Sequence, residues 1–255
     1  MADLSGQSSA HVRHGEALSV LRELPDGHVD AVITDPPYSS GGMVRGDRLQ
    51  DVHTKYIQTD SESGHDLPDF SGDTRDQRGY LMWCSLWLAE CLRVAKPGAV
   101  CAVFTDWRQL PTTTDALQCG GWVWRGIVPW HKPNGRRTQG RFANNCEYVV
   151  WGTAGPRALD AMPNALGGFF QANTTRDRVH IAQKPLEVMR EIVKICPRGG
   201  LVLDPFAGAG TTGVAAVLEN RRFLGIEITE HYAREAQARI DKAAGHFAPE
   251  PGTLI

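Results

Sequence analysis

The sequence predicts an α/β protein with an open, mostly parallel sheet that carries helices on both faces. Short apolar runs typical of buried parallel strands alternate along the chain with longer segments of helical periodicity. The 255 residues give enough length to bury a real core, in one large domain or two small ones. The alternation, without an internal repeat, is what favours the doubly covered sheet.

Seven segments are expected to form strands. Most are runs of four to nine apolar, aromatic or β-branched residues bounded by turn formers, which is the pattern of strands in a covered sheet. The first, "HVRH", is weaker and lies ahead of the others. The strands are predicted at residues 11–14, 30–34, 98–105, 122–130, 146–153, 200–204 and 222–228.

Helices are expected between the strands. Each candidate segment is longer than a typical strand and places its apolar residues three or four positions apart, so that one face of the helix can pack on the sheet. The helices are predicted at residues 16–24, 80–95, 107–118, 185–196, 211–220 and 231–244.

Two stretches do not follow the alternation. Residues 39–79 are rich in turn formers, and positions 47–76 hold eight Asp or Glu against three Lys or Arg. Residues 152–179 also lack a regular pattern. Loops this long inside a compact domain are usually functional or disordered. We therefore expect residues 39–79 to be an acidic insertion within one domain that spans residues 1–255.

Composition limits the class of protein. The formal net charge of −2 does not indicate a nucleic-acid binder by bulk charge, so any basic surface must be local. The six cysteines are scattered without a C-x-x-C pair, which predicts reduced, buried thiols and no metal site. No apolar run is long enough to span a membrane, and the first residues lack a signal-peptide layout. The predicted location is cytoplasmic.

The stretch "AVITDPPYSS" contains the first chemical signal. An apolar strand ends at Asp35, and two prolines and Tyr38 follow it. Proline cannot donate to a β-ladder and restricts the residue before it, so the strand must end there. A carboxylate, a stiff turn and an aromatic ring are therefore expected at the end of this strand. A lone copy of the motif could be only a strand-ending turn.

The second signal is "LVLDPFAGAGTTGVAA". A strand ends at Asp204, and glycines at 208 and 210 allow a sharp turn ahead of a helix start, where unpaired N–H groups can meet a ligand. Glu227 ends the next strand, where an acid can bind ribose hydroxyls. The third glycine of a dinucleotide fingerprint is missing, and Asp204 would repel phosphate. S-adenosylmethionine, which has no phosphate, is favoured over NAD.

Together, "DPPY" and "DPFAGAGTT" resemble the amino-methyltransferases that modify exocyclic nitrogens of DNA bases. The order, with the catalytic motif first and the cofactor motif late, is similar to the permuted β class. "HGEALSVLRELPDGHVDAVITDPPY", "IVPWHKPN" and "HIAQKPLEVMREIV" are further blocks in the expected order. The resemblance covers nearly the whole chain apart from residues 39–79 and 152–179. It implies a Rossmann-like, S-adenosylmethionine-dependent methyltransferase fold.

The resemblance assigns the catalytic role to Asp35, Pro36, Pro37 and Tyr38. An exocyclic amine is a poor nucleophile because its lone pair is delocalised into the ring. The Asp35 carboxylate and the Pro36 carbonyl would accept its two N–H bonds and free the lone pair. The prolines preorganise these acceptors, and Tyr38 would stack on a base that has been flipped out of the duplex.

The resemblance also implies the cofactor site around the glycine turn. Phe206, Gly208 and Gly210 would form the turn itself. Asp204 and Thr211 would lie near the methionine portion of S-adenosylmethionine.

Four more residues complete the implied cofactor site. Glu227 would hold the ribose, while His180 and Lys184 would reach the methionine carboxylate. Glu16 stands where the family usually has an aspartate that contacts the adenine, so its extra methylene departs from the pattern. Lys184 could instead be a solvated lysine at a helix start.

A basic stretch is the candidate DNA contact. Residues 125–141 contain five Lys or Arg and no acid, with aromatic side chains and two flexible glycines between them. Within the candidate DNA-contacting and target-recognition region, 131–179, and just ahead of it, the expected contacts are Trp130, Lys132, Arg136, Arg137 and Arg141. Trp130 could equally be a core residue, and the loop could be merely solvated.

The resemblance favours N6 of adenine as the acceptor, because aspartate at the first position of the tetrapeptide is more typical of adenine enzymes. Cytosine-N4 methylation, an RNA or protein-amide methyltransferase and a non-catalytic DNA-binding relative stay open as alternatives. DNA is the expected partner. A homodimer and a cognate restriction enzyme stay open as further partners. A role without a restriction enzyme, or in a virus, also stays open.

Overall fold

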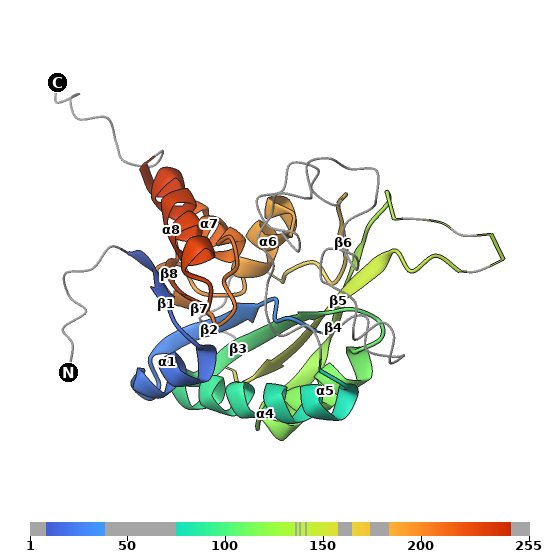
Figure 1. The fold of residues 1–255 in the computed structure, drawn as a ribbon, viewed down its shortest axis with the longest axis horizontal. Coiled ribbons are helices and arrows are strands. Elements are labelled where there is room, and N and C mark those ends of the chain that lie inside the picture. The colour runs from blue at the N-terminus through green and yellow to red at the C-terminus, as the bar shows by residue number, and fades with distance from the viewer. Residues whose placement is uncertain are drawn as a thin grey trace.

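The computed structural model describes residues 9–38, 75–135, 137, 139–140, 142–157, 165–173 and 184–245. Within these residues the chain forms a twisted eight-stranded sheet with helices on both faces (Figure 1). The strands are β1 Ala10–His14, β2 Val29–Thr34, β3 Ala95–Thr105, β4 Val123–His131, β5 Cys146–Thr153, β6 Phe170–Gln171, β7 Leu201–Asp204 and β8 Arg222–Glu227. The helices are α1 Ala17–Glu23, α4 Gln77–Val94, α5 Leu110–Cys119, α6 Leu186–Val193, α7 Thr211–Leu218 and α8 Glu230–Gly245.

The strand order fixes which loops meet. The order is β1-β8-β7-β2-β3-β5-β4-β6, and the first five strands of this series are mutually parallel. β5 runs antiparallel to both β3 and β4. The carboxyl ends of β2, β7 and β8 therefore share one edge of the sheet with the amino end of β5. We call this the carboxyl edge.

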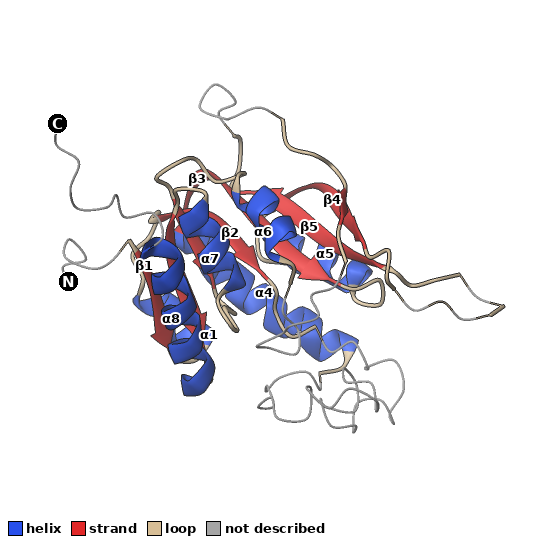
Figure 2. Cartoon of the chain, turned by 90° about the horizontal axis from the view of Figure 1, so that it is seen from above, coloured by secondary structure: helices blue, strands red, loops and turns tan. Residues whose placement is uncertain are grey.

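Two apolar layers cover the sheet, one on each face. Helices α6, α7 and α8 pack on one face and α1, α4 and α5 on the other (Figure 2). Along β2, Ala31 and Ile33 face the first layer while Val32 faces the second, because side chains of a strand alternate between faces. This double burial explains why the strand is a continuous apolar run in the sequence.

The predicted sheet with helices on both faces is confirmed. Every predicted strand and helix is present, and the differences are at the ends. Helix α5 begins at Leu110 rather than 107, because the Asp106 carboxylate accepts bonds from the Arg108 and Gln109 N–H groups and holds a turn there. Strand β6, only two residues long, lies in a stretch predicted to lack a regular element.

The acidic insertion is shorter than predicted at its carboxyl end. Asp76 accepts a hydrogen bond from the Gly79 N–H (2.8 Å) and caps α4, which begins at Gln77. Residues 39–74, the rest of the predicted insertion, lie outside the described residues.

The six cysteines are free, and four of them are buried. Cys119 is exposed and Cys146 half-buried, in contrast to the expectation that all six are buried. Within the described part of the chain, no helix is long and apolar enough to cross a membrane. The same residues contain no cluster of three or more His, Cys, Asp or Glu that could hold a metal ion.

Candidate active site

A buried hydrogen bond joins the two turns that the sequence singles out. Thr34, the last residue of β2, donates from Oγ1 to Oδ1 of Asp204 at the end of β7 (2.6 Å). β2 and β7 are parallel neighbours, so both strands deliver their turns to the carboxyl edge. The Asp35–Tyr38 turn, which we call the catalytic turn after its predicted role, therefore lies beside the glycine turn.

Asp204 serves as an internal anchor. It is 1% exposed and also accepts bonds from Thr212 Oγ1 (2.6 Å) and the Phe206 N–H (3.1 Å). Burial raises the pKa of Asp204 to about 6, against the lowering effect of the threonine hydroxyls. The sequence places this carboxylate near the methionine portion of the cofactor. In the structure this carboxylate is directed inward and holds the strand end, the turn and the helix together.

The glycine turn has the backbone geometry that the sequence predicts. Gly208 and Gly210 have φ of +51° and +77°, a region that favours glycine. A Cβ on Gly210 would also lie 2.8 Å from the Cβ of Ala236 on α8. Thr211 is the first residue of α7 and is buried behind the turn. The turn can therefore offer close backbone approach to a ligand.

Glu227 closes the glycine turn from the neighbouring strand. Its Oε2 accepts a bond from the Gly208 N–H (2.9 Å), and its Oε1 accepts one from the Thr229 N–H (2.8 Å). Burial raises the pKa of Glu227, although these N–H bonds oppose the rise. Each carboxylate oxygen keeps a further lone pair, so the group can still accept bonds from ribose hydroxyls.

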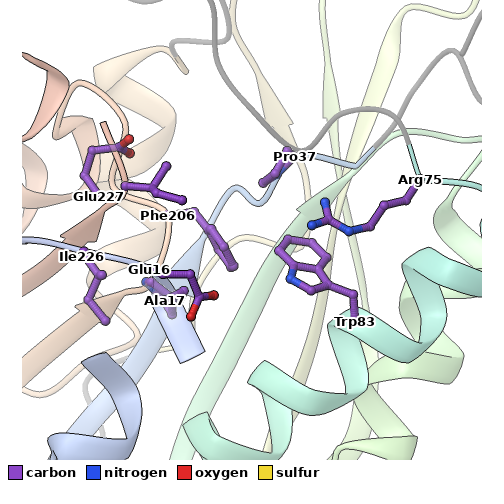
Figure 3. Close-up of a pocket in the computed structure, with 11 residues that line it drawn as sticks. Glu16, Ala17, Pro37, Arg75, Trp83, Phe206, Ile226 and Glu227 are labelled. Carbon is purple, nitrogen blue, oxygen red and sulfur yellow. The ribbon is translucent and has the colours of Figure 1, made fainter. Parts of the chain in front are cut away.

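A pocket connects the two turns (Figure 3). Pro37 lines it from the catalytic turn, and Phe206 and Glu227 line it from the glycine-turn side. Glu16 also lines the pocket, where its carboxylate caps α1 by accepting bonds from the Leu18 and Ser19 N–H groups. Partial burial raises the pKa of Glu16, but these bonds outweigh it and the net shift is downward. The remaining lining residues are Gly15, Ala17, Arg75, Trp83, Pro205, Ile226 and Ile228.

An aromatic wall of this pocket comes from α4 and is absent from the sequence prediction. The Trp83 ring lies 5.2 Å from the Phe206 ring, centroid to centroid, and the Arg75 guanidinium lies 4.1 Å from the Trp83 ring (Figure 3). Aromatic residues at helical spacing in residues 80–87 indicate the inner face of the helix. They do not indicate that Trp83 reaches the pocket, because that depends on how the helix crosses the sheet.

The Asp35 carboxylate is strongly perturbed. Asp35 Oδ2 accepts a bond from Lys184 Nζ (2.5 Å), while its buried Oδ1 has no hydrogen-bond partner among the described residues. Burial raises the pKa of Asp35 to about 6. The Lys184 charge lowers it, and Glu147 raises it again. An acceptor oxygen without a partner is thus present where the resemblance expects the target amine.

Lys184 occupies a different environment from the expected one. The prediction directs it to the methionine carboxylate, whereas the structure pairs its ammonium with Asp35 and with Glu147 Oε2 (3.3 Å). Its side chain is 7% exposed and lies within 6 Å of the rings of Tyr38 (5.6 Å) and Phe104 (5.4 Å). His180, its expected companion, lies outside the described residues.

Glu147 is a site residue that sequence reasoning misses. It lies at the amino end of β5, which the antiparallel pairing with β3 brings to the carboxyl edge. Its second oxygen, Oε1, accepts a bond from Lys132 Nζ (3.0 Å). No local pattern marks this glutamate, because its role arises only when β5 packs beside β3.

The structure places the predicted DNA contacts in different environments. The connection between β4 and β5 projects from the carboxyl edge (Figure 1), and Arg137 in it is exposed. Lys132 is directed inward to Glu147. Trp130 is 1% exposed and donates from Nε1 to the Ala172 carbonyl (3.0 Å), so it is a core residue rather than a surface contact. Two further predicted contacts, Arg136 and Arg141, lie outside the described residues.

Comparison with known proteins identifies relatives along most of the chain. YubD of Escherichia coli (strain K12) is 27% identical over 230 residues, which cover 89% of this chain and 88% of YubD. The type II methyltransferase M.HinfI of Haemophilus influenzae is 23% identical over 250 residues, covering 89% of this chain and 67% of that protein.

Solved structures share the fold. The complex of M1.HpyAVI with SAM superposes with a TM-score of 0.63 at 22% identity, covering 91% of this chain and 99% of that one. The cytosine-N4-specific PvuII DNA methyltransferase superposes with a TM-score of 0.68 at 15% identity, covering 97% of this chain and 89% of that one. The predicted methyltransferase fold is thus confirmed. Residues 29–238 match the family model N6_N4_Mtase, whose description is DNA methylase, and because this match spans most of the chain, the protein belongs to that DNA methylase family.

Proposed function

We propose that this protein transfers the methyl group of S-adenosylmethionine to the exocyclic N6 of an adenine flipped out of duplex DNA. The observation that carries the proposal is the Thr34–Asp204 hydrogen bond, since it holds the catalytic turn beside the glycine turn. A methyl group bound at the second turn can then reach an amine bound at the first.

The residues present fit S-adenosylmethionine. Gly208 permits close backbone approach, Glu227 keeps lone pairs for ribose hydroxyls, and Phe206 with Trp83 offers an aromatic surface for the adenine. Glu16 lies in the same pocket, within reach of the adenine that the resemblance assigns to it. When bound, S-adenosylmethionine supplies an electrophilic methyl group on a sulfonium.

The chain's own residues act on the amine. Asp35 Oδ1 accepts one N–H bond and the Pro36 carbonyl accepts the other, which pulls the nitrogen toward tetrahedral geometry and frees its lone pair. Tyr38 stacks on the extruded base, and Pro37 stiffens the turn. The nitrogen–methyl bond forms as the sulfonium–methyl bond breaks, and the amine loses one proton toward Asp35 or solvent.

The choice of adenine over cytosine N4 rests on the aspartate at position 35, because the two amines present similar geometry. The cytosine-N4 specificity of the PvuII enzyme, which shares the fold, makes cytosine the second candidate. A homodimer and a cognate restriction enzyme are proposals from the resemblance alone. Sedimentation tests the first. The second requires an endonuclease that cuts unmethylated DNA and leaves DNA methylated by this protein intact.

One assay tests the function. The protein is incubated with radiolabelled S-adenosylmethionine and, separately, duplex DNA, RNA and protein, and the products are digested and identified. We expect N6-methyladenine with the wild type and its loss with D35N, which keeps the shape but removes the charge. N4-methylcytosine would select the second candidate, and label only in RNA or protein would overturn the proposal.

A further inference from the structure

At the catalytic turn, Asp35, Lys184 and Glu147 form a cluster of charges from three separate segments, in which Lys184 is buried and the two acids are partly buried. We propose that Lys184 and Glu147 are positioning residues for methyl transfer, which fix the orientation and the ionisation of the Asp35 carboxylate. This inference rests on the proposed function, because it assigns a role within that reaction.

The geometry separates the two oxygens of Asp35. Lys184 Nζ holds Oδ2 at 2.5 Å, and Oδ1 is buried without a hydrogen-bond partner in the described part of the chain. A buried acceptor left unpaired destabilises a protein, so such groups call for an explanation. A carboxylate held by one oxygen keeps a fixed orientation, and its other oxygen is left to accept a bond from the incoming amine.

Glu147 keeps the lysine in place. Its Oε2 lies 3.3 Å from Lys184 Nζ, and its Oε1 accepts a bond from Lys132. Two acids and two lysines thus alternate along one chain of contacts, and their formal charges cancel. Burying an ammonium is costly unless it is paired, and Lys184 is paired on two sides. A solvated lysine at a helix start would show neither the burial nor these partners.

Three charged groups face Asp35 from the elements around it. Lys184, next to α6, lowers the pKa of Asp35, while Glu147 on β5 and Asp204 on β7 raise it. Lys184 itself stays protonated, because the two acids raise its pKa more than burial lowers it. Removing the lysine charge and removing the glutamate charge must therefore shift the ionisation of Asp35 in opposite directions.

The test compares K184M with E147Q, two nearly isosteric changes. For wild type, kcat/KM toward DNA should fall as the pH drops through about 6, the pKa of Asp35. We call this fall the acid limb of the pH profile. We expect K184M to move the acid limb to a pH about one unit higher and to lower kcat roughly 10- to 100-fold. We expect E147Q to move it downward by about half a unit or more.

A matched control comes from the other end of β2. K96M removes a lysine that pairs with Asp30 (2.7 Å) on that strand, and the acid limb should stay where it is. Circular dichroism and urea unfolding establish that each variant folds. The double variant K184M/E147Q, which removes one charge of each sign, should return the limb toward its wild-type position.

A direct titration separates this inference from the function on which it rests. Aspartate labelled with ¹³C at Cγ reports the ionisation of Asp35 by NMR, and the Asp35 signal is the one missing from D35N. Opposite shifts in K184M and E147Q support the inference even in a protein that fails to methylate DNA. No shift, or shifts in the same direction, would overturn it even if DNA methylation is demonstrated.

Cofactor binding decides between this role and the one the sequence suggests for Lys184. If the lysine positions Asp35, calorimetry should show the affinity of K184M for S-adenosylmethionine within about threefold of wild type. A loss of tenfold or more with an unmoved acid limb would assign Lys184 to the methionine carboxylate and refute the positioning role.

Discussion

Single buried polar residues hold the two halves of the site together. Asp204 accepts bonds from Thr34, Thr212 and the Phe206 backbone, so one carboxylate ties a strand end, a turn and a helix start. Placing a carboxylate in the core is costly, as its raised pKa shows. Such a group fixes geometry at the expense of stability.

The loss of unfolding free energy caused by burying Asp204 should depend on pH. Burial raises the pKa of this carboxyl to about 6 in the native state, whereas the ordinary pKa of an aspartate, taken for the unfolded chain, is 3.8. Between these values the native state binds more protons, so its stability falls as the pH rises. Relative to D204N, which can keep the hydrogen bonds, wild type should lose roughly 2–3 kcal/mol of unfolding free energy from pH 4 to 7.

Urea unfolding of both proteins at pH 4.5, 5.5 and 7 measures this difference. D115N, a change at an exposed aspartate of α5, shows how much a surface charge of the same type contributes. If the difference in unfolding free energy between wild type and D204N stays constant over this pH range, Asp204 is not the buried, proton-holding group described above.

The residues that sequence reasoning finds and misses differ in one respect. Asp35 and Glu227 end apolar strands, and this position is visible in the local sequence. Glu147 and Trp83 become site residues only through contacts between distant elements, so no neighbouring residue marks them. Lys184 is found from its motif, but its partner could not be inferred, since Asp35 is 149 positions away along the chain.

At the scale of elements, the position of the glycine turn depends on how α7 packs against α8 and β8. Gly213 lies on the inner face of α7, where an added Cβ would meet Ile240 Cδ1 at 2.4 Å and Phe223 Cε1 at 2.6 Å. The helix can therefore approach its neighbours only because this side chain is absent. The same approach sets where α7 begins, and with it the glycine turn.

G213A should destabilise the protein by about 1–3 kcal/mol, because the extra methyl group overpacks a closely packed contact. Chemical denaturation measures the loss. G245A, at the end of α8, places its Cβ in open space and should be neutral or slightly stabilising, since alanine favours helix. Equal stabilities for the two variants would contradict the packing argument.

Helices and strands were predictable where the spacing of apolar residues in the sequence matches the faces that are buried. Strands β7 and β8 and the helix α7 between them have clear patterns, and their bounds differ from the predicted ones by one or two residues. β6 was not predictable, because two residues carry no period and the strand exists only by pairing with Trp130 and His131 of β4. The start of α5 depends on the two N–H bonds that the Asp106 side chain accepts, and intrinsic helix propensity does not include such bonds.

For the whole molecule, the parallel sheet gathers the site at one edge. Asp35, Asp204 and Glu227 follow or end strands there, and the β4–β5 connection projects from the same edge (Figure 1). The protein carries a net charge of −2, so we expect attraction to DNA to come from a local basic segment, and this one is the candidate. Arg198, by contrast, lies ahead of β7 and hence at the opposite edge.

Charge reversal at Arg136 and Arg137 tests this arrangement. Phosphate contacts release counterions, so the R136E/R137E variant should bind duplex DNA at least tenfold more weakly, with a log–log salt slope shallower by roughly two. Fluorescence anisotropy between 50 and 200 mM salt gives both quantities. R198E, one such reversal on an exposed residue at the opposite edge, should leave the slope unchanged. If R198E flattens the slope and R136E/R137E does not, the DNA lies along the other edge, away from Asp35.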